Sequence, residues 1–236
     1  MNTRTSNALL AVLCAAGMTS LAQAGNVVGY RKTTVPAGLS LYAPPFTTVG
    51  AGSAVGKLSA IRGDFQAGDT LQFLDSNLNK SAVYQWLTPA QGVPSNGWYD
   101  QGQNPVASTN LPQGGSFLLS TTGGVTVLSL GEVLSAPTPL SVPAGYTLVG
   151  NGTAKARPLN DIVFGGAIAL GDTIQFIGSE GTPSAVYAWL TPVAGVPSNG
   201  WYDQDFNPMN PTLSSGCGFI LSMRNGCTLT IPSPFN

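Results

Sequence analysis

The sequence SAVYQWLTP at residues 81–89 returns as SAVYAWLTP at 184–192, and GVPSNGWYDQ at 92–101 returns unchanged at 195–204. Both pairs are separated by 103 positions. Three shorter blocks repeat in the same order: VPAG at 35–38 and 142–145, GDTLQF at 68–73 with GDTIQF at 171–176, and FLLS at 117–120 with FILS at 219–222. Five matching blocks in one order predict an internal duplication, with insertions in the loops between blocks.

The boundary between the two copies is expected in residues 133–141, where two prolines and small residues oppose both a helix and a central strand. We therefore assign residues 25–133 to the first copy and 134–236 to the second. Two units are too few for an open solenoid, which needs about three or more repeats. The duplication predicts two compact β-rich lobes packed about an approximate twofold axis.

Short runs rich in β-branched and aromatic residues, separated by Gly, Pro and Asn, predict strands. In the first copy these runs are residues 39–42, 70–74, 83–87, 117–119 and 125–128. The pattern favours an all-β, mainly antiparallel fold in which each lobe is a sandwich or barrel. Val55, Leu58 and Ile61, matched by residues 159–163, predict at most one short helix in each lobe.

The first 24 residues have the features of a cleaved export signal. Arg4 precedes an apolar run at residues 8–16, and Ala22 and Ala24 supply small residues before the cleavage point. Lipidation of Cys14 fits less well, because the bulky Leu13 precedes it. The run is too short to span a bilayer and no second long apolar segment follows it. We expect an exported protein without a transmembrane segment, located outside the cell, on its surface or in the periplasm.

Charged residues are few, with nine Lys and Arg against ten Asp and Glu. Nucleic-acid binding requires clustered basic side chains that neutralise phosphates, and this sequence has no basic stripe, so we expect no nucleic-acid partner. The hydrophobic fraction of 43% is sufficient for a folded core. The surface must therefore be rich in uncharged polar residues.

Catalytic groups are also scarce, because the chain contains no histidine. This excludes Ser-His and Cys-His pairs and imidazole zinc ligands. Two carboxylates could serve a glycosidase, and the pairs Asp69 with Asp100 or Asp172 with Asp203 are the candidates, although an aspartate before a strand more often stabilises a turn. The sequence predicts no enzymatic activity and no cofactor.

A calcium loop has its ligands at alternate positions, and residues 203–207 carry oxygen-bearing side chains at that spacing. The glycine and the later acidic residue of such loops are missing, and the first copy has one carboxylate fewer. We interpret this segment as a polar turn and predict no metal site.

The repeated NGWYD motif is the most specific candidate for a ligand site. Strand alternation places Tyr84 and Trp86 on one face, so exposed rings could form a sugar-binding platform in which Asp and Asn bind hydroxyls. In the alternative that we favour, the Asn-Gly pair forms a tight turn and the rings fill the core. The candidate ligand-binding residues in the two copies are Tyr84, Trp86, Trp98, Tyr99 and Asp100, and Tyr187, Trp189, Trp201, Tyr202 and Asp203.

The order of these motifs resembles a widespread type of exported bacterial protein with two β repeats and no assigned function. The resemblance rests on an opening Val-Gly-Tyr strand, VPAG, a YxWL strand, GWYD and a glycine-led Phe-rich strand, and it covers nearly the whole chain after residue 24. These motifs are structural. The resemblance implies the architecture and export, and it implies no chemistry.

Cys217 and Cys227 are the two cysteines that remain after the export signal. Exported cysteine pairs often form disulfides. The residues between them predict a strand running into an Asn-Gly turn, and a tight hairpin there would hold the two thiols apart. The sequence leaves open whether they are bonded.

These observations favour a non-catalytic structural or adhesive protein that acts through contacts with other proteins or by self-association at the cell surface. Free edge strands would supply such contacts. The alternative is a carbohydrate-binding module, for which the tryptophan side chains must be accessible to glycans.

Overall fold

The computed structural model describes residues 27–47, 55–112, 114–133, 136–166, 168–177, 181, 183–233 and 235. The predicted export signal, residues 1–24, lies outside these ranges. Residues 134 and 135 of the predicted boundary also lie outside them. The predicted all-β, antiparallel class is confirmed, since every strand pairing is antiparallel. In the described part of the chain, no helix is long and apolar enough to cross a membrane.

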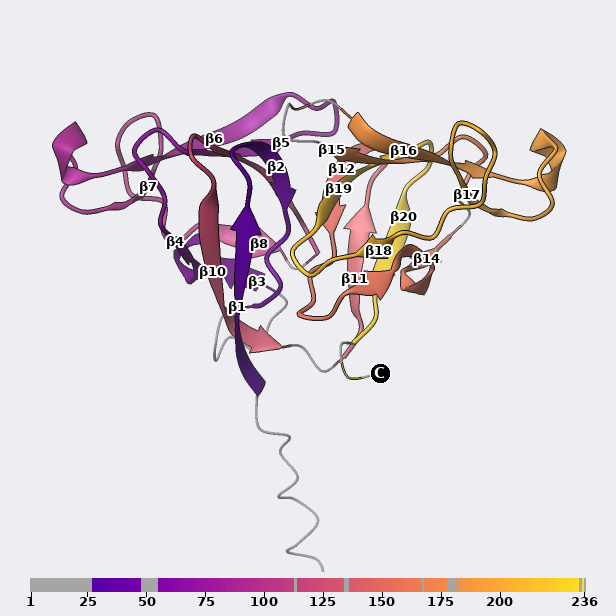
Figure 1. Cartoon of the computed structure of the whole chain (residues 1–236), viewed down its shortest axis with the longest axis horizontal. Helices are drawn as coiled ribbons and strands as arrows, with labels where there is room; N and C mark the ends of the chain where they lie inside the picture. The colour runs from indigo at the N-terminus through magenta and orange to yellow at the C-terminus, as the bar shows by residue number, and fades with distance from the viewer. Residues whose placement is uncertain are drawn as a thin grey trace, which may run out of the picture.

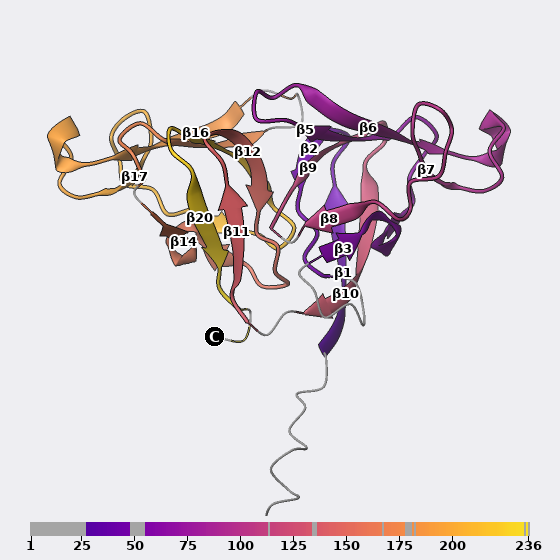
Figure 2. The ribbon, with the colours of Figure 1, turned by 180° about the vertical axis from the view of Figure 1, so that it is seen from behind.

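The first copy forms three sheets (Figures 1 and 2). The five-stranded sheet has the order β2 (Gly38–Tyr42), β9 (Phe117–Thr121), β5 (Thr70–Leu74), β6 (Lys80–Leu87) and β7 (Gly97–Tyr99). The three-stranded sheet has the order β1 (Val27–Val35), β10 (Val125–Val133) and β4 (Ile61–Gly63), and β3 (Val55–Lys57) pairs with β8 (Asn110–Pro112).

The second copy has the same sheets in the same order. Its five-stranded sheet contains β12 (Gly145–Gly150), β19 (Gly218–Met223), β15 (Thr173–Ile177), β16 (Pro183–Leu190) and β17 (Gly200–Tyr202). Its smaller sheets are β11 (Thr138–Val142), β20 (Cys227–Ile231) and β14 (Val163–Gly165), and the pair β13 (Arg157–Pro158) and β18 (Thr212–Leu213). All five strand runs predicted in the first copy fall on strands, while the cut into two lobes at residue 134 stays a prediction.

The predicted short helices are single 3₁₀ turns. One lies at the predicted place in each copy, η1 (Leu58–Ala60) and η3 (Leu159–Asp161), and buries one leucine. A second, which the sequence analysis did not predict, follows the YxWL strand, as η2 (Pro89–Gln91) and η4 (Pro192–Ala194). Each of these ends at a glycine with positive φ, Gly92 or Gly195, because only glycine adopts that backbone conformation without strain.

The core of each copy lies between its large and small sheets, as in a β-sandwich. In the first copy, Phe117 and Leu119 from the five-stranded sheet pack with Val125 and Val127 from the three-stranded sheet. In the second copy, Phe219 and Leu221 pack with Leu229 in the same way. Strand alternation turns the intervening residues, Leu118 and Ile220, to the opposite face.

Those opposite faces meet where the two five-stranded sheets pack against each other (Figures 1 and 2). Leu41 and Leu118 of the first copy form one buried cluster with Leu148 and Ile220 of the second. We call this contact the junction. Strands β9 and β19 are therefore buried on both faces, which explains their continuous apolar sequences.

Backbone contacts across the junction occur in reciprocal pairs, as a local twofold relation requires. The amide of Ala43 donates to the carbonyl of Gly216 at 3.0 Å, and the equivalent amide of Gly150 donates to the carbonyl of Gly114 at 2.9 Å. Two isolated bridges, Tyr42 with Cys217 and Val149 with Gly115, are exchanged in the same way.

The side chains at this axis are not identical in the two copies. A Cβ added to Gly150 would lie 2.6 Å from the Cβ of Ala43, its equivalent in the first copy. A Cβ added to Gly218 would lie 3.0 Å from the Cβ of Ser116, which is again its equivalent, and 2.8 Å from that of Leu41. One copy therefore carries a small side chain where the other must have glycine.

We predict that Gly150→Ala lowers the free energy of unfolding by about 1–3 kcal/mol, because the new Cβ would overlap the carbonyl oxygen of Cys217 beside the paired strand and the Cβ of Ala43 across the junction. Ala43→Gly in the same chain should restore part of this loss. Gly200→Ala is the matched control, since its new Cβ would meet only Tyr202, at 3.5 Å. Denaturant unfolding measures all three, and equal effects of the two glycine substitutions would show that the junction tolerates a side chain at residue 150.

Candidate binding sites

The ten candidate residues of the NGWYD and YxWL motifs do not form one site. Trp98 and Trp201 are 5% and 2% exposed and belong to the cores of their copies. Their cross-strand partners Trp86 and Trp189 are half-buried and contact them edge to face, with centroids 5.3 and 5.2 Å apart. The rings therefore fill the core, which is the arrangement that the sequence analysis favoured over an exposed platform.

The tyrosines of the motif lie elsewhere. Tyr99 is buried on the other face with Leu87 and Val93, and its hydroxyl donates to the carbonyl of Ser95 at 2.9 Å. Tyr202 makes the same bond to Ser198 at 3.0 Å. Tyr84 and Tyr187 instead pack edge to face on Phe73 and Phe176, against the core clusters of their own copies.

The Asn-Gly pair of the motif does not form the predicted tight turn. Gly97 is the first residue of β7 and pairs with Leu87, so residues 88–96 connect the two strands as a longer loop that contains η2. Pro89 is the first residue of η2, and its ring fixes the backbone there. The rule that an Asn-Gly pair forms a two-residue hairpin turn does not take such a loop into account.

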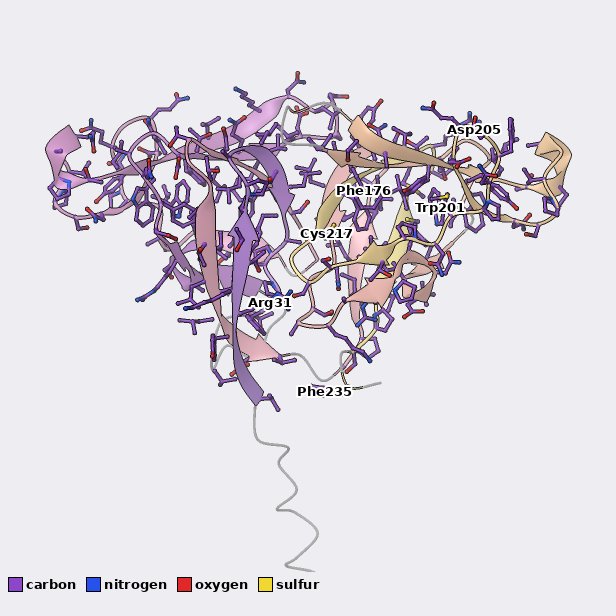
Figure 3. The ribbon with its side chains drawn as sticks, viewed as in Figure 1. Arg31, Phe176, Trp201, Asp205, Cys217 and Phe235 are labelled. Carbon is purple, nitrogen blue, oxygen red and sulfur yellow. The ribbon has the colours of Figure 1, made fainter. Side chains whose placement is uncertain are left out.

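The aspartates of the motif stabilise turns. Asp100 accepts hydrogen bonds from the amides of Gly102 and Asn104 at 2.8 and 2.9 Å, and Asp203 does so from Asp205 and Asn207. The backbone amide and side chain of Asn104 lower the pKa of Asp100 below its usual value, and Asn207 lowers that of Asp203 through its side chain and amide. Figure 3 shows Asp205 in this turn at the upper edge of the second copy.

Asp69 and Asp172, the other candidates for paired carboxylates, are buried and hold loops together. Asp69 accepts the amides of Gln66 and Thr122, each at 2.9 Å. Asp172 accepts those of Ala169 and Arg224 at 2.7 and 2.8 Å. Among the described residues, no three His, Cys, Asp or Glu side chains are grouped closely enough to hold a metal ion.

The two cysteines are free thiols. Strand β19 lies between them and extends over about 20 Å, whereas the Cα atoms of a disulfide lie about 4.4–6.8 Å apart. Cys217 is at the junction, near the middle of the molecule in Figure 3, and Cys227 pairs with Val142 at the start of β20. Since β19 and β20 belong to different sheets, the predicted hairpin at Asn225-Gly226 is not formed and the structure contains no Cys217–Cys227 bond.

We predict that two thiols of the chain without its predicted export signal, residues 1–24, react with Ellman's reagent after unfolding with no prior reduction. Burial raises the pKa of both thiols, and the charge of Asp172 raises that of Cys227 further, so the folded protein should react much more slowly at pH 8. A disulfide would show itself as fewer than two thiols in the unfolded, unreduced chain.

A pocket of about 600 Å³ opens beside the tryptophans of the second copy. In the first copy, Phe65 packs against both Trp86 and Trp98, at 5.1 and 4.9 Å. The equivalent of Phe65 in the second copy is Ile168. Phe65 precedes Gln66, whose amide donates to Asp69, and Ile168 precedes Ala169, whose amide donates to Asp172. The lining residues carry no charge: Leu159, Asn160, Ile162, Phe164, Gly166, Ile168, Trp189, Thr191, Asn199, Gly200 and Trp201.

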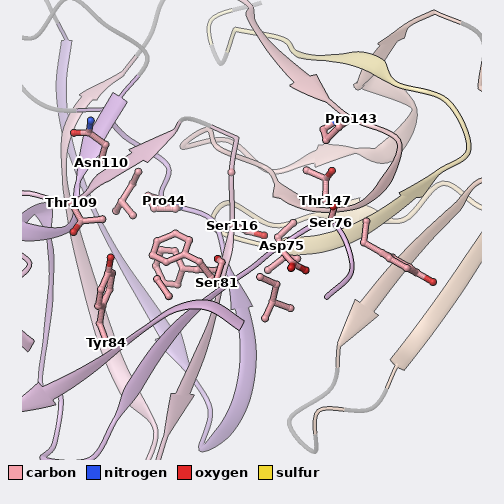
Figure 4. Close-up of a pocket in the computed structure, with 18 residues that line it drawn as sticks. Pro44, Asp75, Ser76, Ser81, Tyr84, Thr109, Asn110, Ser116, Pro143 and Thr147 are labelled. Atoms are coloured by element: carbon pink, nitrogen blue, oxygen red, sulfur yellow. The ribbon is translucent and has the colours of Figure 1, made fainter. Parts of the chain in front are cut away.

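A second pocket, of about 500 Å³, lies at the junction (Figure 4). We call it the junction cavity. Its walls come from β5, β6, β8 and β9 of the first copy and from the start of β12 in the second, and they include Phe73, Tyr84, Phe117, Tyr146 and Leu148. The sequence analysis predicted Tyr84 as a ligand residue, but it could not predict this cavity, because part of the wall, Pro143 and residues 146–148, lies about 60 residues away along the chain.

The longest open edge in the described structure belongs to β1, which pairs only with β10. Val28 and Tyr30 are 57% and 71% exposed on one face of this strand. Tyr30 lies opposite Leu130, which is also exposed. We call this feature the β1–β10 ribbon; its free end projects from the molecule in Figure 1.

Comparison with known proteins yields no matching family model, no matching curated protein and no matching solved structure.

Proposed function

We propose that this is a non-catalytic protein of the cell exterior that acts through protein–protein contacts, and that the β1–β10 ribbon makes them with a second copy of the chain. The observation that carries the proposal is the exposure of Val28 and Tyr30 on the edge strand β1, with the exposed Leu130 beside them on β10. Long edges with apolar side chains add further strands readily, because their backbone donors and acceptors are free.

Antiparallel pairing of two β1 strands about Gly29 fits this surface. That register places Tyr30 of each copy opposite Val28 of the other, an aromatic and β-branched pair of the kind that stabilises sheets. It leaves Lys32 outside the paired Val27–Arg31 segment, so no two lysines face each other. The formal net charge of −1 adds little repulsion between copies.

We predict a weak dimer with a dissociation constant on the order of 100 µM, because five paired residues bury far less than a standard interface. Sedimentation analysis between about 10 µM and about 1 mM should show it, and Tyr30→Lys should weaken it at least about tenfold through charge repulsion. Val193→Lys is the control, since Val193 is 91% exposed far from the ribbon. Sedimentation as a monomer over the whole range contradicts the proposal.

We infer carbohydrate binding as a second candidate function, and the observation in its favour is the pocket that Ile168 leaves open beside Trp189. A half-buried indole can contact the C–H face of a pyranose, and Asn160, Asn199 and Thr191 can bind hydroxyls at the rim. The uncharged lining suits a neutral sugar. In the first copy Phe65 packs against both Trp86 and Trp98, so we place this candidate site in the second copy's pocket.

We predict that cellohexaose or chitohexaose changes the tryptophan emission, with a dissociation constant in the range of about 0.1–1 mM. Ile168→Phe should weaken this binding about tenfold or more, because it fills the pocket as Phe65 does in the first copy. Phe65→Ile, at the matched position, should leave the affinity of the second-copy site unchanged. Iodide quenching checks that the tryptophans are accessible to solvent. If neither oligosaccharide nor iodide changes the tryptophan emission, carbohydrate binding is excluded as a function.

A further inference from the structure

The junction cavity contains hydroxyl groups with no protein partner. The side-chain oxygens of Ser116 and Thr147 are buried and make no hydrogen bond, and Ser116 is only 6% exposed. Both residues line the cavity, and Figure 4 shows Ser116 near its centre and Thr147 on the side of the second copy. Buried hydroxyls without partners are rare in folded proteins, because water or another polar group normally satisfies them.

The rest of the wall combines aromatic and aliphatic side chains with the polar residues Ser76, Ser81, Thr109 and Asn110 and with one carboxylate. Phe73 contacts the rings of both Tyr84 and Phe117, at centroid distances of 6.0 and 5.8 Å, and Leu148 lies on the other side. The one charged lining residue is Asp75, whose carboxylate accepts the amides of Asn77 and Asn79, both at 2.9 Å, within its own turn. No lysine or arginine lines the cavity, so an anionic ligand would find no counter-charge here.

The repeat itself does not require the Ser116 hydroxyl. Gly218 occupies the equivalent position in the second copy and has no side chain, although the strand order and register around it are the same. At this position, then, only the first copy carries a hydroxyl, and that hydroxyl lies at the junction cavity. The Ser116 hydroxyl is therefore not needed to form the sheets.

We propose that the junction cavity binds a small uncharged molecule consisting of an aromatic or alicyclic ring with one hydroxyl or carbonyl group. The ring lies against Phe73, Tyr84 and Phe117, and the polar group forms a hydrogen bond with Ser116. This follows the usual chemistry of ligand pockets, in which apolar walls supply affinity and a few polar groups fix the orientation. The inference is independent of the dimer and of the carbohydrate pocket.

The test compares p-cresol, which has a ring and a hydroxyl, with toluene, which has the ring alone. Calorimetric titration should show that the protein binds p-cresol more tightly than toluene. Ser116→Ala should raise the dissociation constant for p-cresol about five- to tenfold, the effect of losing one hydrogen bond, and leave that for toluene unchanged. Serine and alanine differ here by one hydroxyl, so the fold is not at risk.

A blocking variant and its matched control locate the site. Ala82→Phe places a ring at the cavity wall and should abolish binding of both probes, whereas Ala185→Phe, at the equivalent position of the second copy, should leave it intact. Nuclear Overhauser contacts between p-cresol and the Leu148 methyl groups provide a measurement that does not depend on how either variant folds.

Three results would each overturn the proposal. The first is no binding of p-cresol at millimolar concentration, which would mean that water alone satisfies the two hydroxyls. The second is an equal loss of binding in Ala82→Phe and Ala185→Phe. The third is binding that shows no contact with Leu148 and no sensitivity to Ser116→Ala.

Discussion

The packing of the two five-stranded sheets at the junction is the contact on which the rest of the structure depends. Leu41, Leu118, Leu148 and Ile220 fill it. Without it, each sheet would expose a row of large aliphatic side chains, a surface that monomeric proteins rarely present to water. The junction also sets the distance between β5 and β12 and so creates the cavity between them. A sandwich of either copy alone would have a core but not this cavity.

Duplication within one chain permits a junction that two identical chains could not form. At the local twofold axis, Ala43 meets Gly150 and Ser116 meets Gly218. In a symmetric dimer of one sequence, each of these contacts would pair a residue with its own copy, giving a clash between two side chains or a void between two glycines. Once both copies belong to one chain, each position can change by itself. The packing at the axis is therefore a consequence of covalent linkage.

The sequence predicted the strands well because their signal is local. Alternation, β-branched residues and repeated blocks identified β2, β5, β6, β9 and β10, and placed Trp86 and Trp98 in the core. The Asn225-Gly226 turn failed because the dipeptide rule assumes two strands of one sheet, whereas β19 and β20 belong to different sheets. The Asn96-Gly97 turn failed because Gly97 is already the first residue of β7 and pairs with Leu87. The same sheet change separates Cys217 from Cys227. The cavity was not predictable, because its wall joins residues distant in the chain and no local pattern records that contact.

The comparison of the two copies separates residues that maintain the fold from residues free to do something else. The GWYD segments are identical in the two copies and have the same roles in both. In each copy the tryptophan is buried, the tyrosine hydroxyl donates to a carbonyl of the preceding loop, and the aspartate accepts amide hydrogen bonds within a turn. Among the positions that differ are Phe65 and Ile168, and Ser116 and Gly218. Each pair lies at one of the two pockets, where it decides whether space or a hydroxyl is present. The divergent positions are thus the ones that distinguish the candidate site in one copy from the equivalent place in the other.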